Sequence, residues 1–259
     1  MVLAFVVIGI LAPVIAPYDP TKADLRNAIA PPSPAHLLGT DHLGRDELSR
    51  ILVASRTSLI AVTAVAAIAF VLGMTLGVAS GFIGGVFDQV VMRIVDLFIG
   101  LPSLVLGLAL VGLVGPSLVT LILALGVTWW PQYARLARSQ VLVTRHLPYV
   151  EALQVLGMPP ARILTRHIVP ATIGPVVILL STDAGNILLA VAGFSFLGLG
   201  VQPPTPEWGQ MLVEARRYLQ AAPILMIAPG VAIFLVVLAF NLLGNRLSLR
   251  YDPAARDAA

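Results

Sequence analysis

The sequence contains no cysteine and few charged residues. The absence of cysteine from its 259 residues excludes disulfides, thiolate metal sites and cysteine nucleophiles. Charged residues make up 11% of the chain and hydrophobic residues 58%, which is far from the mixture of a soluble globular protein. The net charge of +3 is too small to indicate a nucleic-acid partner. The composition therefore predicts a protein that lies in a lipid bilayer.

The chain also lacks the motifs of several enzyme classes. It has no Gly-x-x-x-x-Gly-Lys-[Ser/Thr] phosphate-binding loop, no His-Glu-x-x-His zinc pair and no Gly-x-Ser-x-Gly nucleophile elbow. His36 and His42 lie close in sequence, but a metal site needs more ligands than two. We therefore expect no metal site in this chain and no ATP hydrolysis by the chain itself.

Apolar stretches recur along the sequence at about the length that crosses a hydrocarbon core, which takes about 20 helical residues. We place six of them near residues 1–17, 57–83, 90–114, 117–136, 171–200 and 223–244. The first is short and lacks the positively charged leader of a signal peptide. The sequence thus predicts an all-α membrane protein with about six transmembrane helices.

Arginines are concentrated in one of the loops between these stretches. This loop carries one acidic residue and the arginines Arg135, Arg138, Arg145, Arg162 and Arg166. The loop after the first stretch carries equal numbers of basic and acidic residues. Basic residues in short loops are retained on the cytoplasmic side of a membrane. We therefore expect the arginine-rich loop inside and, with six spans, both termini in the cytoplasm.

The arginine-rich loop contains two predicted short helices that meet at a corner. Residues 149–156 repeat apolar side chains at helical spacing, and Gly157 can end this helix in a left-handed conformation. Pro159 and Pro160 suit the first turn of the next helix. An amphipathic helix lying on the membrane would explain the apolar side chains but not the corner.

The order of residues around this corner resembles the cytoplasmic coupling loop of the membrane-spanning subunits of bacterial ABC importers. In that family the loop fits a groove on an ATP-hydrolysing partner. The resemblance implies an ATPase-coupling role for Glu151, Ala152, Gly157, Arg162, Ile163, His167 and Pro170. Leu153 stands where the family's Glu-Ala-Ala triplet has its second alanine, so the fit to the groove is expected to differ in detail.

Two further segments narrow the resemblance to the C-type chain of the dipeptide, oligopeptide and nickel permeases. They are Gly-Thr-Asp-His-Leu-Gly-Arg-Asp-Glu-Leu-Ser-Arg at 39–50 and Ser-Phe-Leu-Gly-Leu-Gly-Val-Gln-Pro-Pro-Thr-Pro-Glu-Trp-Gly at 195–209. The first either positions the outer face or also touches a delivered binding protein, and the second forms an outer gate or a rigid packing element. The outer-face residues singled out are Asp41, Gly44, Arg45, Asp46, Arg50, Gly198, Gly200 and Trp208.

The resemblance implies a type I ABC importer permease fold in the bacterial cytoplasmic membrane. We expect a first helix and outer loop with an interfacial helix in 1–56, a permease core in 57–250 with the coupling loop at 137–170, and a cytoplasmic tail at 251–259. The implied partners are a B-type permease, two ATPase subunits or domains that bind ATP and Mg, and an extracytoplasmic binding protein. Peptides are the implied substrate, with nickel or a nickel chelate as the alternative. An intramembrane enzyme or a passive channel is the alternative from another class.

Polar residues within the apolar stretches are candidates for the translocation pathway, because an unpaired polar group in hydrocarbon costs several kcal/mol. Asp183 and Asn186 are three residues apart and share a helical face. They either meet a peptide's amino group in a hydrated pathway, or Asp183 pairs with an arginine or a helix end. Arg93 and Asp96 have the same spacing, and we expect a salt bridge between them.

Overall fold

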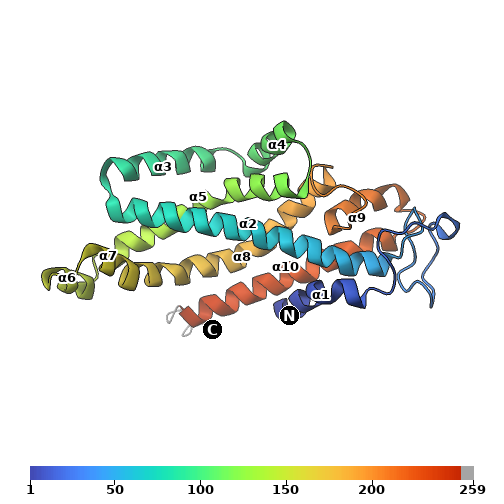
Figure 1. The fold of residues 1–259 in the computed structure, drawn as a ribbon, viewed down its shortest axis with the longest axis horizontal. Coiled ribbons are helices and arrows are strands. Elements are labelled where there is room, and N and C mark those ends of the chain that lie inside the picture. The colour runs from blue at the N-terminus through green and yellow to red at the C-terminus, as the bar shows by residue number, and fades with distance from the viewer. Residues whose placement is uncertain (252–259) are drawn as a thin grey trace.

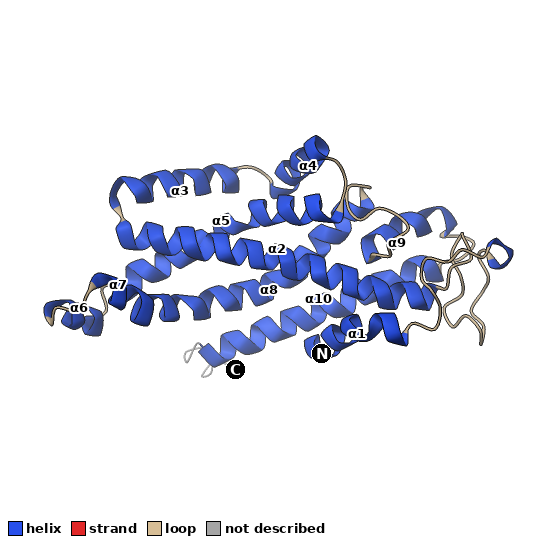
Figure 2. Ribbon diagram, viewed as in Figure 1, coloured by secondary structure: helices blue, strands red, loops and turns tan. Residues whose placement is uncertain are grey.

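The computed structural model describes residues 1–251, and its long elements in that range are all helices (Figures 1 and 2). The expected all-α fold is therefore confirmed, while the expected tail lies, apart from its first residue, outside the described part of the chain. The helices are α1 Val2–Ile15, α2 Glu47–Ile83, α3 Gly85–Gly100, α4 Ser103–Val114, α5 Leu118–Thr144, α6 Pro148–Val155, α7 Pro160–Ile163, α8 Val169–Phe196, α9 Trp208–Ala215 and α10 Ile224–Tyr251. Short helical turns are η1 Leu25–Asn27, η2 Leu164–Ile168 and η3 Arg216–Tyr218.

Five of the six expected apolar stretches each coincide with one helix, and the third is divided between two. In the described residues three helical runs are long and apolar enough to cross a membrane: α2, the run from α7 through α8, and α10. The pair α3 and α4 meets the same criteria when taken together. The helix α1 is shorter, with 14 residues, and α5 carries polar side chains in its second half.

The third expected span, residues 90–114, is broken. The axes of α3 and α4 are bent by 91° at Leu101 and Pro102. Leu101 is extended, with φ −96° and ψ 136°. A residue before proline is pushed out of the helical region, and the proline has no N–H to continue the ladder. The expected span at 90–114 is therefore divided into two helices at Pro102.

The second span begins earlier than expected. Asp46 caps α2 by accepting a hydrogen bond from the Ser49 N–H, and the helix then runs without interruption to Ile83. The separate interfacial helix expected before residue 57 is therefore the first part of α2. At 1.5 Å per residue α2 is roughly 55 Å long, so it extends well beyond a hydrocarbon core of about 30 Å.

The helices α2 and α5 pack closely along a row of glycines on α2, namely Gly73, Gly77 and Gly81. A Cβ atom added to Gly77 would lie 2.3 Å from the backbone oxygen of Ala134 on α5. Small residues at a spacing of four allow two helix backbones to approach this closely in a membrane. The most extensive helix pairing in the described chain is that of α2 with α5.

Gly77→Val is expected to force α2 and α5 apart and to lower the free energy of unfolding by about 1–3 kcal/mol, as overpacking typically does. The thermal stability of the purified complex measures this effect. Gly230→Val is the matched control, because a Cβ at Gly230 on α10 meets nothing within 4 Å. Equal melting of the two variants would contradict the importance of the close contact.

The long helices form an elongated bundle with two different ends (Figure 1). The loop 16–46 and α9 lie at one end, and α6 and α7 lie at the other. The N-terminal end of α1 and the C-terminal end of α10 both point toward the end that carries α6 and α7. This arrangement places the two conspicuous sequence motifs, the corner and the outer-face residues, at opposite ends of the molecule.

Candidate functional site

The corner at Gly157 has the predicted helix-turn-helix geometry. Gly157 has φ +79°, in the left-handed region. The Met158 N–H donates to the Leu153 oxygen and the Gly157 N–H donates to the Gln154 oxygen, both at 3.0 Å. These two bonds are the Schellman pattern of a glycine-ended helix. Pro160 is the first residue of α7, so the predicted turn is confirmed on both sides.

The corner has a buried inner face and an exposed apolar tip. Val150 of α6 and Ile163 of α7 are buried in a core that they share with α2, α5 and α8. At the tip Val155 is 88% exposed and Leu156 is 81% exposed. Isolated exposed apolar side chains are ordinary, but two adjacent ones at the tip of a protruding turn indicate a docking surface.

The other expected coupling residues are distributed from α6 to the start of α8. Glu151, Ala152 and Arg162 are exposed. The His167 ring packs against Tyr149 with ring centroids 6.1 Å apart. The remaining residue of the set, Pro170, is exposed at the start of α8.

The second helix of the corner continues directly into a membrane span. A single turn of π-helix, η2, joins α7 to α8, and the segment from Pro160 to Phe196 counts as one apolar run. Asp183 lies on this run, roughly 35 Å from Pro160 at 1.5 Å per residue. A displacement of the corner can therefore be transmitted to Asp183 along one continuous helical segment.

Asp183 accepts hydrogen bonds from three neutral side chains. The Gln132 Nε2 and the Tyr133 hydroxyl donate to Oδ2 at 2.9 and 3.0 Å. The Asn186 Nδ2 donates to Oδ1 at 3.3 Å, as expected for a shared face. Among the described side chains, those of residues 1–249, no basic group forms an ion pair with Asp183. This geometry favours the pathway interpretation over pairing with an arginine.

A surface cavity of about 310 Å³ lies between the α3–α4 bend and α5. Gln132 lines the cavity and also donates to Asp183. The other lining residues are Phe98, Ile99, Leu101, Pro102, Ser103, Thr128, Trp129 and Pro131. Asp183 itself does not line the cavity, and Gln132 is the residue that connects the two.

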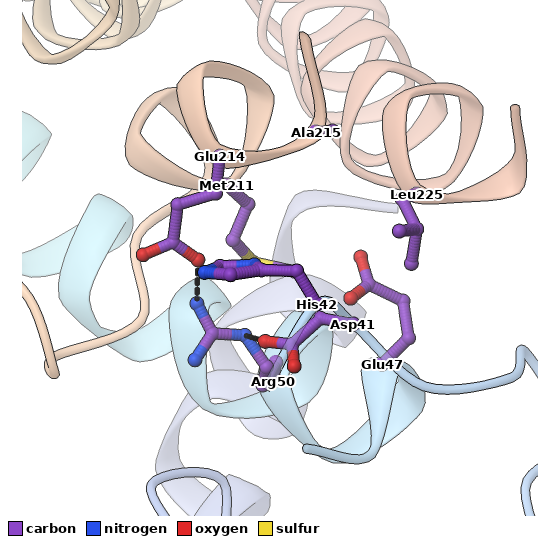
Figure 3. Close-up of a pocket in the computed structure, with 8 residues that line it drawn as sticks. All are labelled: Asp41, His42, Glu47, Arg50, Met211, Glu214, Ala215 and Leu225. Carbon is purple, nitrogen blue, oxygen red and sulfur yellow. Dashed lines mark hydrogen bonds and ion pairs between the residues drawn. The ribbon is translucent and has the colours of Figure 1, made fainter. Parts of the chain in front are cut away.

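At the opposite end, Asp41, Arg45 and Arg50 form a buried ion network with Glu214. Figure 3 shows the part that contains Asp41, Arg50 and Glu214. Arg45 donates to Asp41 at 2.6 Å and to Glu214 of α9 at 2.8 Å. Arg50 donates to the same Glu214 oxygen at 2.7 Å and lies 3.4 Å from Asp41. Both arginine side chains are at most 2% exposed. The network ties the loop 16–46 and α2 to α9.

The loop around this network is held by backbone geometry and by further side-chain bonds. Gly44 has φ +76°, and a Cβ there would collide with the Asp24 oxygen. The Asp41 carboxylate accepts from the N–H groups of Leu43 and Arg45. Asp46 caps α2 and also lies 2.9 Å from the His36 ring nitrogen.

One group of residues in the described chain has the spacing of a cation site. Ligand atoms of Asp41, His42 and Glu214 lie within 4.8 Å of one another. Both carboxylates already bind the buried arginines, so a metal ion would have to compete with two positive charges. The arrangement therefore favours an ion network over a metal centre.

The second outer motif packs against the start of α2. Trp208 is buried and its Nε1 donates to the Ile51 oxygen at 3.2 Å. A Cβ at Gly200 would lie 2.0 Å from the Ser195 hydroxyl oxygen, and Gly198 has φ +80°. Of the two interpretations of this motif, the geometry favours rigid packing.

Sequence reasoning missed several partners that lie far away in the chain. Glu214 lies 164 residues from Arg50, and Gln132 lies 51 residues from Asp183. The expected salt bridge between Arg93 and Asp96 was wrong, because Asp96 binds Arg135 at 2.6 Å. Helical spacing shows which residues share a face but carries no information about pairs between helices.

Comparison with known proteins gives consistent matches over most of the chain. Residues 73–257 match the family described as binding-protein-dependent transport system inner membrane component. The chain is 40% identical over 257 residues to the nickel transport system permease protein NikC of Escherichia coli (strain K12), covering 97% of this chain and 93% of that protein. It is 39% identical over 258 residues to the dipeptide transport system permease protein DppC of Haemophilus influenzae, covering 97% and 88%.

A solved structure supports the fold. The chain resembles the inward-facing MetNI methionine ABC transporter with a TM-score of 0.61, over 76% of this chain and 94% of that one. The two sequences are 19% identical, so this likeness concerns the fold alone.

Proposed function

The chain belongs to the family of binding-protein-dependent transport system inner membrane components, and on this premise we propose that it forms half of a membrane pathway for dipeptides or oligopeptides. It is a non-catalytic, membrane-spanning permease subunit of an ATP-driven importer, in which a separate subunit hydrolyses ATP. The observation that carries the substrate proposal is the Asp183 carboxylate, which has only neutral hydrogen-bond partners in the described chain. Such a carboxylate suits the positively charged amino group of a peptide.

The exposed tip at Val155 and Leu156 is the proposed contact with the ATPase. Burying such a side chain completely contributes about 1.5–3 kcal/mol. ATP-driven closure of two ATPase subunits would displace the tip. The helical segment from Pro160 to Phe196 would transmit this displacement to the pathway. In this proposal ATP and Mg bind to the ATPase subunits, and this chain binds neither.

The remaining partners follow from the two ends of the bundle. A B-type permease would complete the pathway, and an extracytoplasmic binding protein would dock at the end that carries the loop 16–46. The N-terminal end of α1 and the C-terminal end of α10 then both face the cytoplasmic side, in agreement with the arginine-rich loop. The membrane is the bacterial cytoplasmic membrane.

Import of nickel or a nickel chelate is the second candidate, because NikC is among the relatives at 40% identity. The geometry gives it less support. In the described residues the group with metal-ligand spacing has its carboxylates bound to Arg45 and Arg50. Uptake of labelled nickel, dipeptides and longer peptides in a strain that lacks only this chain separates the candidates.

Asp183→Asn is expected to lower the uptake of peptides with a free amino group by about 10–150-fold, because a hydrogen bond to a charged group contributes about 1.5–3 kcal/mol. Asparagine keeps an oxygen for Gln132 and Tyr133, and its amide can donate to a reoriented Asn186 side chain. The substitution therefore removes the charge and leaves the packing unchanged. Uptake into proteoliposomes, normalised to assembled complex, measures the effect.

N-acetylated peptides are the matched control for this variant, since they carry no charged amino group. Their slow uptake should be the same in the parent and the variant. Normal transport of free peptides by the assembled Asn variant would refute the pathway role. A variant that melts well below the parent while each surviving complex transports normally would assign Asp183 to packing.

A further inference from the structure

A groove on the membrane face of the bundle, between α1, α2 and α10, has no role in the proposed function. Its volume is about 590 Å³. Its walls are mostly apolar side chains such as Val6, Ile60 and Phe240. One charged residue, Arg56 of α2, also lines it.

Arg56 lies at a boundary in the composition of α2. Charged residues occur among the first ten residues of the helix, and none follows Arg56 as far as Ile83. An arginine at the edge of a long apolar run is positioned at the level of lipid headgroups. Arg56 is exposed, and no carboxylate of residues 1–251 lies within salt-bridge distance of it. Its guanidinium is therefore available to an anion from outside the described chain.

The groove extends from Arg56 toward the middle of the membrane. Its lining on α2 ends at Ala67, roughly 16 Å further along the helix axis. Half of a hydrocarbon core of about 30 Å is about 15 Å, so the groove spans one leaflet. Gly9 of α1 packs beside Arg56 of α2, since a Cβ there would lie 3.6 Å from the Arg56 Cα, an ordinary contact distance.

We propose that this groove binds an anionic phospholipid from the leaflet next to the loop 16–46, with its phosphate on Arg56 and one acyl chain along α2 toward Ala67. Arginine presents a planar set of N–H donors that matches phosphate oxygens. Along the acyl chain, the apolar side chains of the groove make the contacts that neighbouring lipid tails make in the bilayer. The bound lipid fills the space between α1 and the rest of the bundle, and thereby holds the short helix α1 in place.

The test uses the complete importer complex in bilayers that contain phosphatidylglycerol with a photoreactive group on its acyl chain. Photolabelling of the parent should fall on α1 and on residues 59–67 of α2. Arg56→Gln should lower this labelling about fivefold, the expected share of one basic residue at a membrane surface. Ala67→Phe should also lower it, because the ring fills the far end of the groove.

Two variants serve as matched controls. Arg93→Gln removes an exposed arginine of α3, and Val71→Phe adds a ring to an exposed position of α2 outside the groove. Neither should change the labelling of α1 and α2. Equal labelling of the Arg56→Gln and Arg93→Gln complexes would overturn the proposal. Cross-linking of a reactive probe at position 67 to another protein segment would also overturn it, since the groove would then be an interface between proteins.

Discussion

Glu214→Ala is expected to destabilise the protein by about 3–5 kcal/mol, the typical cost of removing one partner from a buried ion pair. The Glu214 carboxylate binds Arg45 at 2.8 Å and Arg50 at 2.7 Å, and the two arginine side chains are 2% and 1% exposed. Without it, the two buried positive charges keep an ion pair only with Asp41 among the described residues, although the buried Glu47 lies nearby. The yield and melting temperature of the purified complex measure the loss.

Asp96→Ala is the matched control for this prediction. The pair of Arg135 with Asp96 is equally short, at 2.6 Å, but its side chains are 52% and 57% exposed. An exposed ion pair contributes about 0–1 kcal/mol, so this variant should melt close to the parent. Similar melting of the Glu214→Ala and Asp96→Ala complexes would show that burial of the network does not matter for stability.

The network also shows why only part of the outer site was predictable. Asp41, Arg45 and Arg50 belong to one short sequence motif, and their type and order indicated a structured outer face. Glu214 lies in another part of the chain, in no motif, and only the packing of α9 against α2 brings it to the arginines. A balanced count of charges within one loop gives no indication of a partner outside that loop.

The fold was predictable where a local signal determines the backbone. Gly157 with the following prolines determines the corner, and the apolar stretches give the positions of the helices. The expected start of the second span at residue 57 was wrong, since α2 begins at Glu47. Charged residues at the end of a long helix that extends beyond the membrane have the same sequence pattern as those of a separate interfacial helix. The break at Pro102 was missed because membrane helices often tolerate an internal proline, as α5, α8 and α10 do here.

The glycine row of α2 was visible in the sequence at 73, 77 and 81, but its partner helix was not. A spacing of four places the glycines on one face of the helix, and any neighbouring helix with small residues can pack closely against that face. The pairing with α5 depends on the tertiary structure. The carboxylate of Asp183 is a similar case, because its helical face follows from residue spacing, whereas its partners Gln132 and Tyr133 belong to another helix.

Gly157→Val is expected to lower uptake per assembled complex by about 5–150-fold. A Cβ at this position meets nothing within 4 Å, so the substitution causes no steric clash. Its effect comes from φ +79°, which a β-branched residue adopts at a cost of about 1–3 kcal/mol. The exposed tip at Val155 and Leu156 would then be displaced, while the buried Val150 and Ile163 keep their packing and the complex still assembles.

Uptake and binding-protein-stimulated ATP hydrolysis, both measured in proteoliposomes, distinguish loss of coupling from loss of fold. The Gly157→Val complex should assemble in normal amounts but lose both activities together. Gly157→Asn is the matched control, because asparagine tolerates the left-handed conformation and should retain most of the uptake. If the Val variant transports like the parent, the left-handed corner is not needed for coupling. If the Asn variant is impaired as strongly as the Val variant, the side chain at this position matters and the backbone argument fails.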